Sequence, residues 1–223
     1  MLSSVGEAIT AVGGLGTAAF GLVDATKPLS GINHLGFSGV RRVVAHLTPG
    51  NDAANALSHS KIFATLEANW INGTDLANQK AIAKSLIKLY LNADNAAAVA
   101  RAAGVDPDVL TSVAKKIASG APQGPAESDV FGRFDLIVTA ILDEAYQRAD
   151  QIYRNGTRLL AMVIAIVLGV AGAFCLDKSL TPPWQDIAAG FIVGLLATPL
   201  APIAKDPSTA LATATNALQA VKK

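Results

Sequence analysis

Histidine is the side chain best suited to bind a metal or move a proton near neutral pH, and this chain has three: His34, His46 and His59. Their separations of 12 and 13 residues match no metal-binding motif, because two histidines that bind a metal from one helix lie four residues apart. None of them has an acidic neighbour in the sequence. We therefore expect three ordinary surface or packing residues and no metal site.

The other residues with reactive chemistry are equally isolated. Cys175 is the only cysteine, which excludes an internal disulfide and a cysteine-cluster zinc site. Asp143 and Glu144 are adjacent carboxylates, but neighbours on a helix point about 100° apart and do not form an acid–base pair. The glycine-rich stretches at 13–16 and 31–39 lack the Gly-Lys-Ser/Thr of a phosphate-binding loop. The sequence predicts no catalytic or cofactor-binding residue, and we expect a protein that is not an enzyme.

The composition indicates a membrane protein instead. The chain has 223 residues and a net charge of +1, and 51% of its residues are hydrophobic. Only 16% are charged, against about 25% in soluble domains. These values exclude a disordered chain and a strongly basic nucleic-acid-binding protein.

Two uncharged runs hold most of the apolar excess, at residues 159–176 and 187–204. A helix of 18 residues is about 27 Å long, close to the hydrocarbon thickness of a bilayer. The runs therefore predict a C-terminal transmembrane hairpin, with Trp184 at the membrane interface. Pro199 and Pro202 are expected to kink the second helix or end it early. The alternative is a pair of buried helices in a soluble core, for which so short a chain has little other surface to cover them.

Residues 8–23 form a third apolar segment, which either enters the membrane or lies on a surface or inside the protein. Gly13, Thr17 and Gly21 are spaced four residues apart, a small-residue pattern that lets two helices approach closely in lipid. Arg154 and Arg158 precede the hairpin and predict that its flanks face the cytoplasm, where they anchor the inner interface.

The middle of the chain reads as a water-exposed helical domain. Residues 36–48 fit either a strand or a short helix. Residues 120–129 read as a Gly/Pro-rich linker, and Asn155-Gly156 marks a candidate kink or break in the helix that follows. Ile82, Leu86 and Leu89 share the expected apolar face of their helix. Helices are expected at about 51–69, 76–91, 95–103, 107–120, 131–158 and 207–221.

Lys80, Lys84 and Lys88 form a basic stripe, because residues four apart share a helix face. The stripe is either a solvated surface or a contact with anionic lipid headgroups.

Three stretches carry a resemblance: GGLGTAAFGLVDATK at 13–27, DEAYQRADQIYRNGTRLLA at 143–161 and LLATPLAPIAKDPSTALATATNAL at 195–218. Together they resemble a group of uncharacterised bacterial integral membrane proteins, in which an amphipathic helix leads into a two-helix hairpin. The resemblance implies a multi-pass protein of the bacterial inner membrane, in contact with its lipids. It implies no activity.

The sequence thus predicts an all-α integral membrane protein. Its expected parts are an apolar helix at 1–26, a cytoplasmic helical domain at 27–130, a long helix with the hairpin at 131–206 and a C-terminal helix at 207–223. One functional hypothesis is a homo-oligomeric scaffold or pore, and the other is a membrane-anchored adaptor that binds a cytoplasmic protein. Neither involves nucleic acid.

Overall fold

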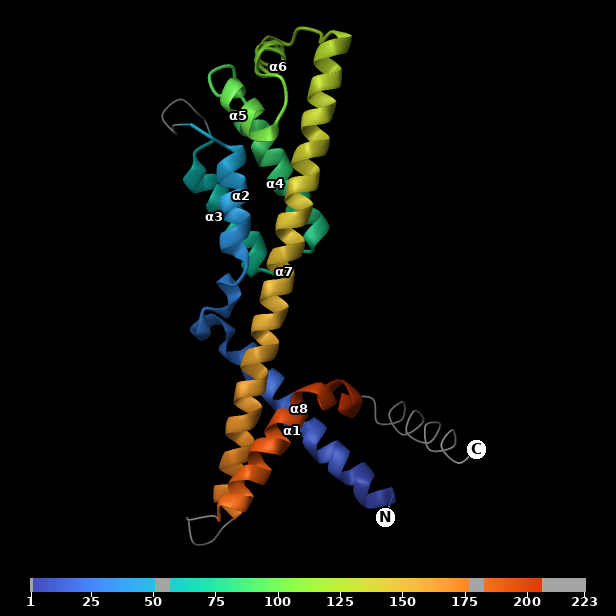
Figure 1. The fold of residues 1–223 in the computed structure, drawn as a ribbon. Coiled ribbons are helices and arrows are strands. Elements are labelled where there is room, and N and C mark those ends of the chain that lie inside the picture. The colour runs from blue at the N-terminus through green and yellow to red at the C-terminus, as the bar shows by residue number, and fades with distance from the viewer. Residues whose placement is uncertain (1, 51–56, 177–182, 206–223) are drawn as a thin grey trace, which may run out of the picture. The chain divides into compact units, whose positions relative to one another are not determined.

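A computed structural model describes residues 2–50, 57–176 and 183–205, and the side chains of residues 9–26, 31–50, 57–175 and 183–199. The described residues form helices and no strand, so the predicted all-α fold is confirmed (Figure 1). Residues 36–48, left open between strand and helix, contain α2. The helices are α1 (Leu2–Ser30), the 3-10 turn η1 (Ile32–His34), α2 (Phe37–Leu47), α3 (His59–Ile71), α4 (Leu76–Tyr90), α5 (Ala96–Ala103), α6 (Pro107–Ser119), α7 (Pro125–Leu176) and α8 (Trp184–Lys205).

Local capping explains where several of these helices begin and end. The Asp75 carboxylate accepts the backbone N–H of Asn78 at 3.0 Å and starts α4. Asp106 does the same for α6, with Pro107 as its first helical residue. Gly104 and Gly120 end α5 and α6 in the left-handed conformation, with φ of 70° and 71°. The predicted boundaries of these three helices are confirmed to within a residue or so.

Three boundaries differ from the predictions. The helix α3 begins at His59, where the Ser58 hydroxyl accepts the N–H of Lys61 at 3.4 Å. The continuous helix predicted from about residue 51 is therefore wrong at residues 57 and 58, which are not helical, and residues 51–56 lie outside the described part. Since α7 begins at Pro125, the predicted linker is shorter than 120–129. Asn155-Gly156 neither breaks nor ends α7, which stays helical through both. The expected helix at 207–221 also lies outside the described residues.

Residues 33–153 form one compact unit. Its helices α2 to α6 lie along the first half of α7 (Figure 1). The largest fully buried side chains are aromatic, and each helix presents one apolar face to the core. The core includes Phe37, Val44, Ile62, Leu66, Trp70, Ile87, Tyr90, Val99, Leu110, Phe134, Val138, Leu142 and Tyr146.

The apolar face predicted for α4 is confirmed in part. Ile82 and Leu86 are half-buried and pack against the core, whereas Leu89 is 73% exposed. The lysine stripe of α4 lies on the side that contacts α7. The buried face of α4 is made by Gln79, Ala83, Ile87 and Tyr90.

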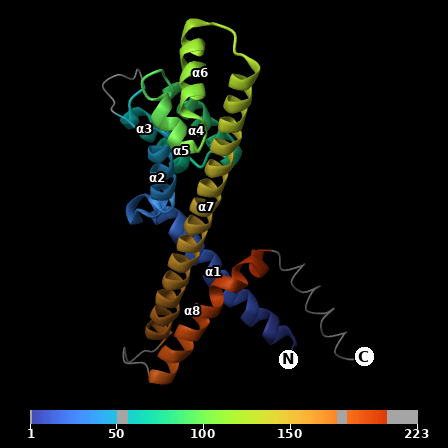
Figure 2. The same ribbon diagram turned by 45° about the horizontal axis from the view of Figure 1, so that its top comes forward.

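Residues 1–32 and 154–223 form the second unit. It contains α1, the second half of α7 and α8, and α1 packs against α8 (Figure 2). Ala19, Ala165 and Ala197 form the small buried cluster of these three helices. The expectation that α8 ends early is wrong, because it stays helical past Pro199 and Pro202 to Lys205. Its ribbon bends in the last turns (Figure 1).

Candidate functional site

Three glycines bring the backbones of α7 and α8 into contact. A Cβ on Gly190 would lie 2.5 Å from the carbonyl oxygen of Gly169, and a Cβ on Gly169 would collide with the oxygen of Gly190. A Cβ on Gly194 would collide with the backbone of Ile166. Only glycine fits at such a crossing. We did not predict this contact, although the four-residue spacing of Gly190 and Gly194 is the usual signal for it.

Small residues also line the inner face of α1. Gly13, Gly16 and Ala19 are buried, and the Thr17 hydroxyl donates to the Gly13 carbonyl at 3.1 Å. Gly21, the last member of the predicted stripe, is exposed, and a Cβ on it would meet no atom within 4 Å. Residues four apart advance by about 40° around a helix, so the stripe turns away from the inner face. A contact of Gly21 with a second copy of the chain stays a prediction.

Five of the exposed residues among the described side chains of α1 are alanine or glycine, and the other three are Thr10, Leu22 and Asp24. The five small residues follow steps of three and four, the spacing of a helix contact seam. A Cβ on Gly14 or Gly21 would meet nothing within 4 Å. We call this set the outer face of α1, and its residues are Ala11, Gly14, Ala18, Gly21 and Ala25.

Two helices among the described residues are long and apolar enough to cross a membrane. They are α1, within Ile9–Thr26 at a mean hydropathy of 1.3, and α7, within Pro125–Cys175 at 2.3. The predicted second arm at 187–204 lies in α8, but the side chains of residues 200–204 and the turn at 177–182 lie outside the described part. Large apolar side chains that are exposed include Leu159, Val163, Val167, Phe174, Phe191, Ile192, Leu195 and Leu196.

The residues predicted to lie at the membrane interface are exposed. Trp184, the first residue of α8, is 74% exposed. Arg154 and Arg158 are exposed on α7, just before its apolar run. Exposure at these positions is compatible with contact with lipid headgroups, which stays a prediction.

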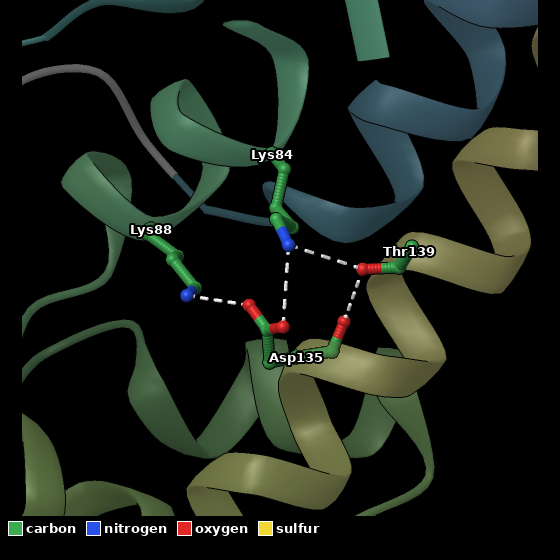
Figure 3. Close-up of polar contacts among 4 residues, drawn as sticks. All are labelled: Lys84, Lys88, Asp135 and Thr139. Carbon is green, nitrogen blue, oxygen red and sulfur yellow. Dashed lines mark hydrogen bonds and ion pairs between the residues drawn. The ribbon is translucent and has the colours of Figure 1, made fainter. Parts of the chain in front are cut away.

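The lysine stripe of α4 faces carboxylates of α7 in the helical bundle (Figure 3). Lys84 Nζ lies 3.2 Å from Asp135 Oδ2 and donates to the Thr139 hydroxyl at 3.3 Å. Lys88 Nζ lies 2.5 Å from Asp135 Oδ1. One further pair, between Lys80 and Asp143, extends the row along the two helices.

These ion pairs give the stripe a structural role that we did not predict. Lys88 first, and then Lys84, hold the pKa of the Asp135 carboxyl below its usual value, against the opposing effect of burial. Lipid contact by Lys80, Lys84 and Lys88 stays untested, but all three lysines already pair with two carboxylates of the bundle, Asp135 and Asp143. The sequence did hold a signal for these ion pairs, because Asp135, Thr139 and Asp143 have the same four-residue spacing as the three lysines.

A second polar cluster joins α6 to the start of α7. The Glu127 carboxylate accepts hydrogen bonds from Lys116 Nζ at 2.6 Å, the Ser112 hydroxyl at 2.7 Å and the Gly124 N–H at 2.6 Å. These donors, Lys116 foremost, lower the pKa of Glu127 to about 2. A glutamate that binds the N–H just before a helix is half of a capping box, so the cluster has a structural explanation.

The described residues hold no group of three metal-ligating side chains. His34 Nδ1 lies 3.0 Å from Glu67 Oε1, an exposed contact that joins η1 to α3. His59 Nε2 lies 2.5 Å from the Thr48 carbonyl oxygen, and its ring packs against Phe63. A shallow surface groove of about 420 Å³ lies over the outer side of α4. Its lining residues are Thr74, Asn78, Ala81, Ile82, Ser85 and Leu86.

No known protein family, curated protein or solved structure matches this chain. The expected kinship with bacterial inner-membrane proteins therefore rests on the three sequence stretches alone.

Proposed function

We propose that this chain is a non-enzymatic integral membrane protein that binds copies of itself, as a scaffold or a channel-like assembly. The observation that carries the proposal is the outer face of α1, a row of five exposed alanine and glycine residues spaced three and four apart, beside which Leu22 and Asp24 are also exposed.

The exposed apolar side chains of the second unit support membrane insertion. Val163 and Val167 on α7 and Ile192 and Leu196 on α8 are 49–60% exposed in the single chain. A soluble monomer rarely exposes so many large apolar side chains on neighbouring helices, whereas hydrocarbon covers them without cost. Helices also satisfy their own backbone hydrogen bonds, as spanning segments must.

The composition of α1 supports self-association. Lipid tails are as apolar as leucine, so helices in a membrane associate through close packing, and small residues allow the closest approach. The inner face of α1 follows this principle within the chain, where Gly13, Gly16 and Ala19 are buried. The outer face has the same composition, and a second α1 fits it better than lipid does. Repeating the contact by a symmetry axis builds a closed assembly.

The bacterial inner membrane is the proposed location. Arg154 and Arg158 precede the apolar run at 159–176, and basic residues next to a span favour the cytoplasmic side. The helical bundle at 33–153 would then lie in the cytoplasm. The resemblance to bacterial inner-membrane proteins points to the same compartment.

Glycine-to-leucine substitutions test the contact without disturbing the single chain. Gly14→Leu and Gly21→Leu add side chains where nothing lies within 4 Å, so we expect folding to be kept and close helix packing between copies to be lost. In native membranes treated with an amine-reactive cross-linker, the wild type should give dimers and larger species, and both variants should give monomers. Gly172→Leu is the matched control, because Gly172 on α7 is also uncrowded.

Two results would contradict the proposal. A wild-type cross-linking pattern in Gly21→Leu would exclude the outer face of α1 as the contact. Release of the wild-type chain from membranes by alkaline carbonate would exclude integral insertion.

The second candidate function is a membrane-anchored adaptor, and the outer side of α4 favours it. Leu89 is 73% exposed and follows Leu86 of the surface groove, so this side presents apolar surface to a cytoplasmic protein. An adaptor keeps its function when residues 154–223 and 1–32 are replaced by an unrelated membrane anchor, whereas a self-associating membrane assembly loses it.

A further inference from the structure

Thr198 carries the only polar side chain of the apolar run at 187–204. It is 8% exposed, and its hydroxyl has no hydrogen-bond partner among the described residues. A threonine inside a helix usually donates to the carbonyl four residues earlier, as Thr17 does to Gly13 and Thr26 does to Leu22 in α1. Thr198 does not make this bond, so its hydroxyl needs another partner.

The backbone beside Thr198 also lacks donors. In a regular helix the N–H of residue 199 bonds the carbonyl of Leu195, and the N–H of residue 202 bonds the carbonyl of Thr198. Both positions are proline, which has no N–H, although α8 remains helical to Lys205. Thr198 thus combines a buried hydroxyl without a partner and a carbonyl without its helical donor.

The surroundings of Thr198 restrict what can supply the missing hydrogen bonds. Thr198 follows Gly190 and Gly194 at four-residue intervals on α8, and both glycines meet the α7 backbone. Its neighbour Ala197 packs with Ala19 and Ala165. Glycine and alanine side chains have no donors, and the runs at 159–176 and 187–204 contain no charged residue to balance an ion. A small neutral donor fits these conditions, and a cation does not.

We propose that Thr198 holds a buried water molecule, which donates to the carbonyl freed by Pro202 and exchanges a hydrogen bond with the Thr198 hydroxyl. Water is the smallest molecule that both donates and accepts, and buried waters occur at polar groups that the protein leaves unsatisfied. A bound water would let α8 bend at the proline pair without exposing bare backbone groups to hydrocarbon. The inference concerns the single chain and does not depend on self-association.

Nuclear magnetic resonance of the full chain in detergent micelles tests this directly. We expect a magnetisation-transfer cross-peak between water and the Thr198 amide and methyl protons. Gly190, about two turns earlier on α8, is the internal control and should give no such peak. Thr198→Val, which keeps the shape and removes the hydroxyl, should abolish the peak, and Pro202→Ala, which restores a helical N–H, should weaken it.

The wild-type spectrum alone can overturn the proposal, whatever the variants do. No cross-peak at Thr198 in the folded wild type would mean that the site is dry. Equal peaks at Thr198 and Gly190, or a full peak in folded Thr198→Val, would mean that water enters the micelle without binding the hydroxyl.

Discussion

Tyr146 is fully buried, yet its hydroxyl has no hydrogen-bond partner among the described residues. Burial raises the pKa of this phenol, so the hydroxyl stays protonated and neutral. Its ring lies 6.5 Å from that of Trp70, centre to centre. The residue therefore contributes to the core through its ring, while its oxygen is desolvated without compensation.

We expect Tyr146→Phe to leave the stability of the bundle unchanged or to raise it, because the substitution removes an unsatisfied polar atom and keeps the ring. Tyr90→Phe is the matched control, since the Tyr90 hydroxyl donates to the Pro49 carbonyl at 3.3 Å. The control should lose about 1 kcal/mol. Thermal unfolding followed by tryptophan fluorescence measures both. A larger loss in Tyr146→Phe than in Tyr90→Phe would contradict this account.

Gly36 precedes α2 with φ of 86°, and a Cβ on it would collide with the backbone of Ala149 on α7. Gly73 has a similar φ of 68° but open space around it. The left-handed conformation alone costs a non-glycine residue about 1–2 kcal/mol. We therefore expect Gly73→Ala to lose about that much stability and Gly36→Ala to lose clearly more, as measured by thermal unfolding. Equal losses of stability in the two variants would show that α2 and α7 can move apart at little cost to make room for the added Cβ at Gly36.

A charged side chain, Glu127, joins α6 to the start of α7. Glu127 has a pKa of about 2 in the folded chain, against an ordinary value of 4.5. A carboxyl with a lowered pKa stabilises the fold above its ordinary pKa and loses that contribution as the pH falls to the folded value. The stabilising effect of Glu127 should therefore be complete above about pH 4.5 and disappear towards pH 2.

A comparison of the wild type with Glu127→Gln isolates this contribution, because other acidic groups such as Asp135 are common to both proteins. We expect the wild type to have the higher melting temperature at pH 6, and the difference to shrink between pH 4.5 and 2. Thermal unfolding at a series of pH values measures it. A difference that does not change with pH would show that the Glu127 charge does not stabilise the fold.

The sequence predicted the helices better than it predicted their faces. Capping residues such as Asp75 and Asp106 bind backbone N–H groups only two or three residues further along the chain, so the helix boundaries could be predicted from local sequence. The exposure of Leu89 could not be predicted, because α4 carries two candidate apolar faces. The partners of its lysine stripe, Asp135 and Asp143, are more than 45 residues away in the sequence. The crossing at Gly190 was missed for a similar reason, since many glycine pairs occur without a partner helix.

At the scale of the whole molecule, the described chain consists of a helical bundle with an aromatic core and a unit of apolar helices built on small residues. α7 is one continuous helix that contributes residues to both. Charged residues are more frequent in the bundle than in the unit of apolar helices. The function was harder to predict from the sequence than the fold, because the surface proposed to carry it consists of alanine and glycine and has no reactive group.

The central claim is that the chain binds copies of itself within the membrane. The most direct measurement is the protein mass in mild detergent, by light scattering corrected for bound detergent. We predict a discrete multiple of 22.8 kDa, reduced to a single chain by Gly21→Leu. A mass of one chain at every protein concentration, with the wild type folded, would contradict the claim and leave the adaptor as the better account.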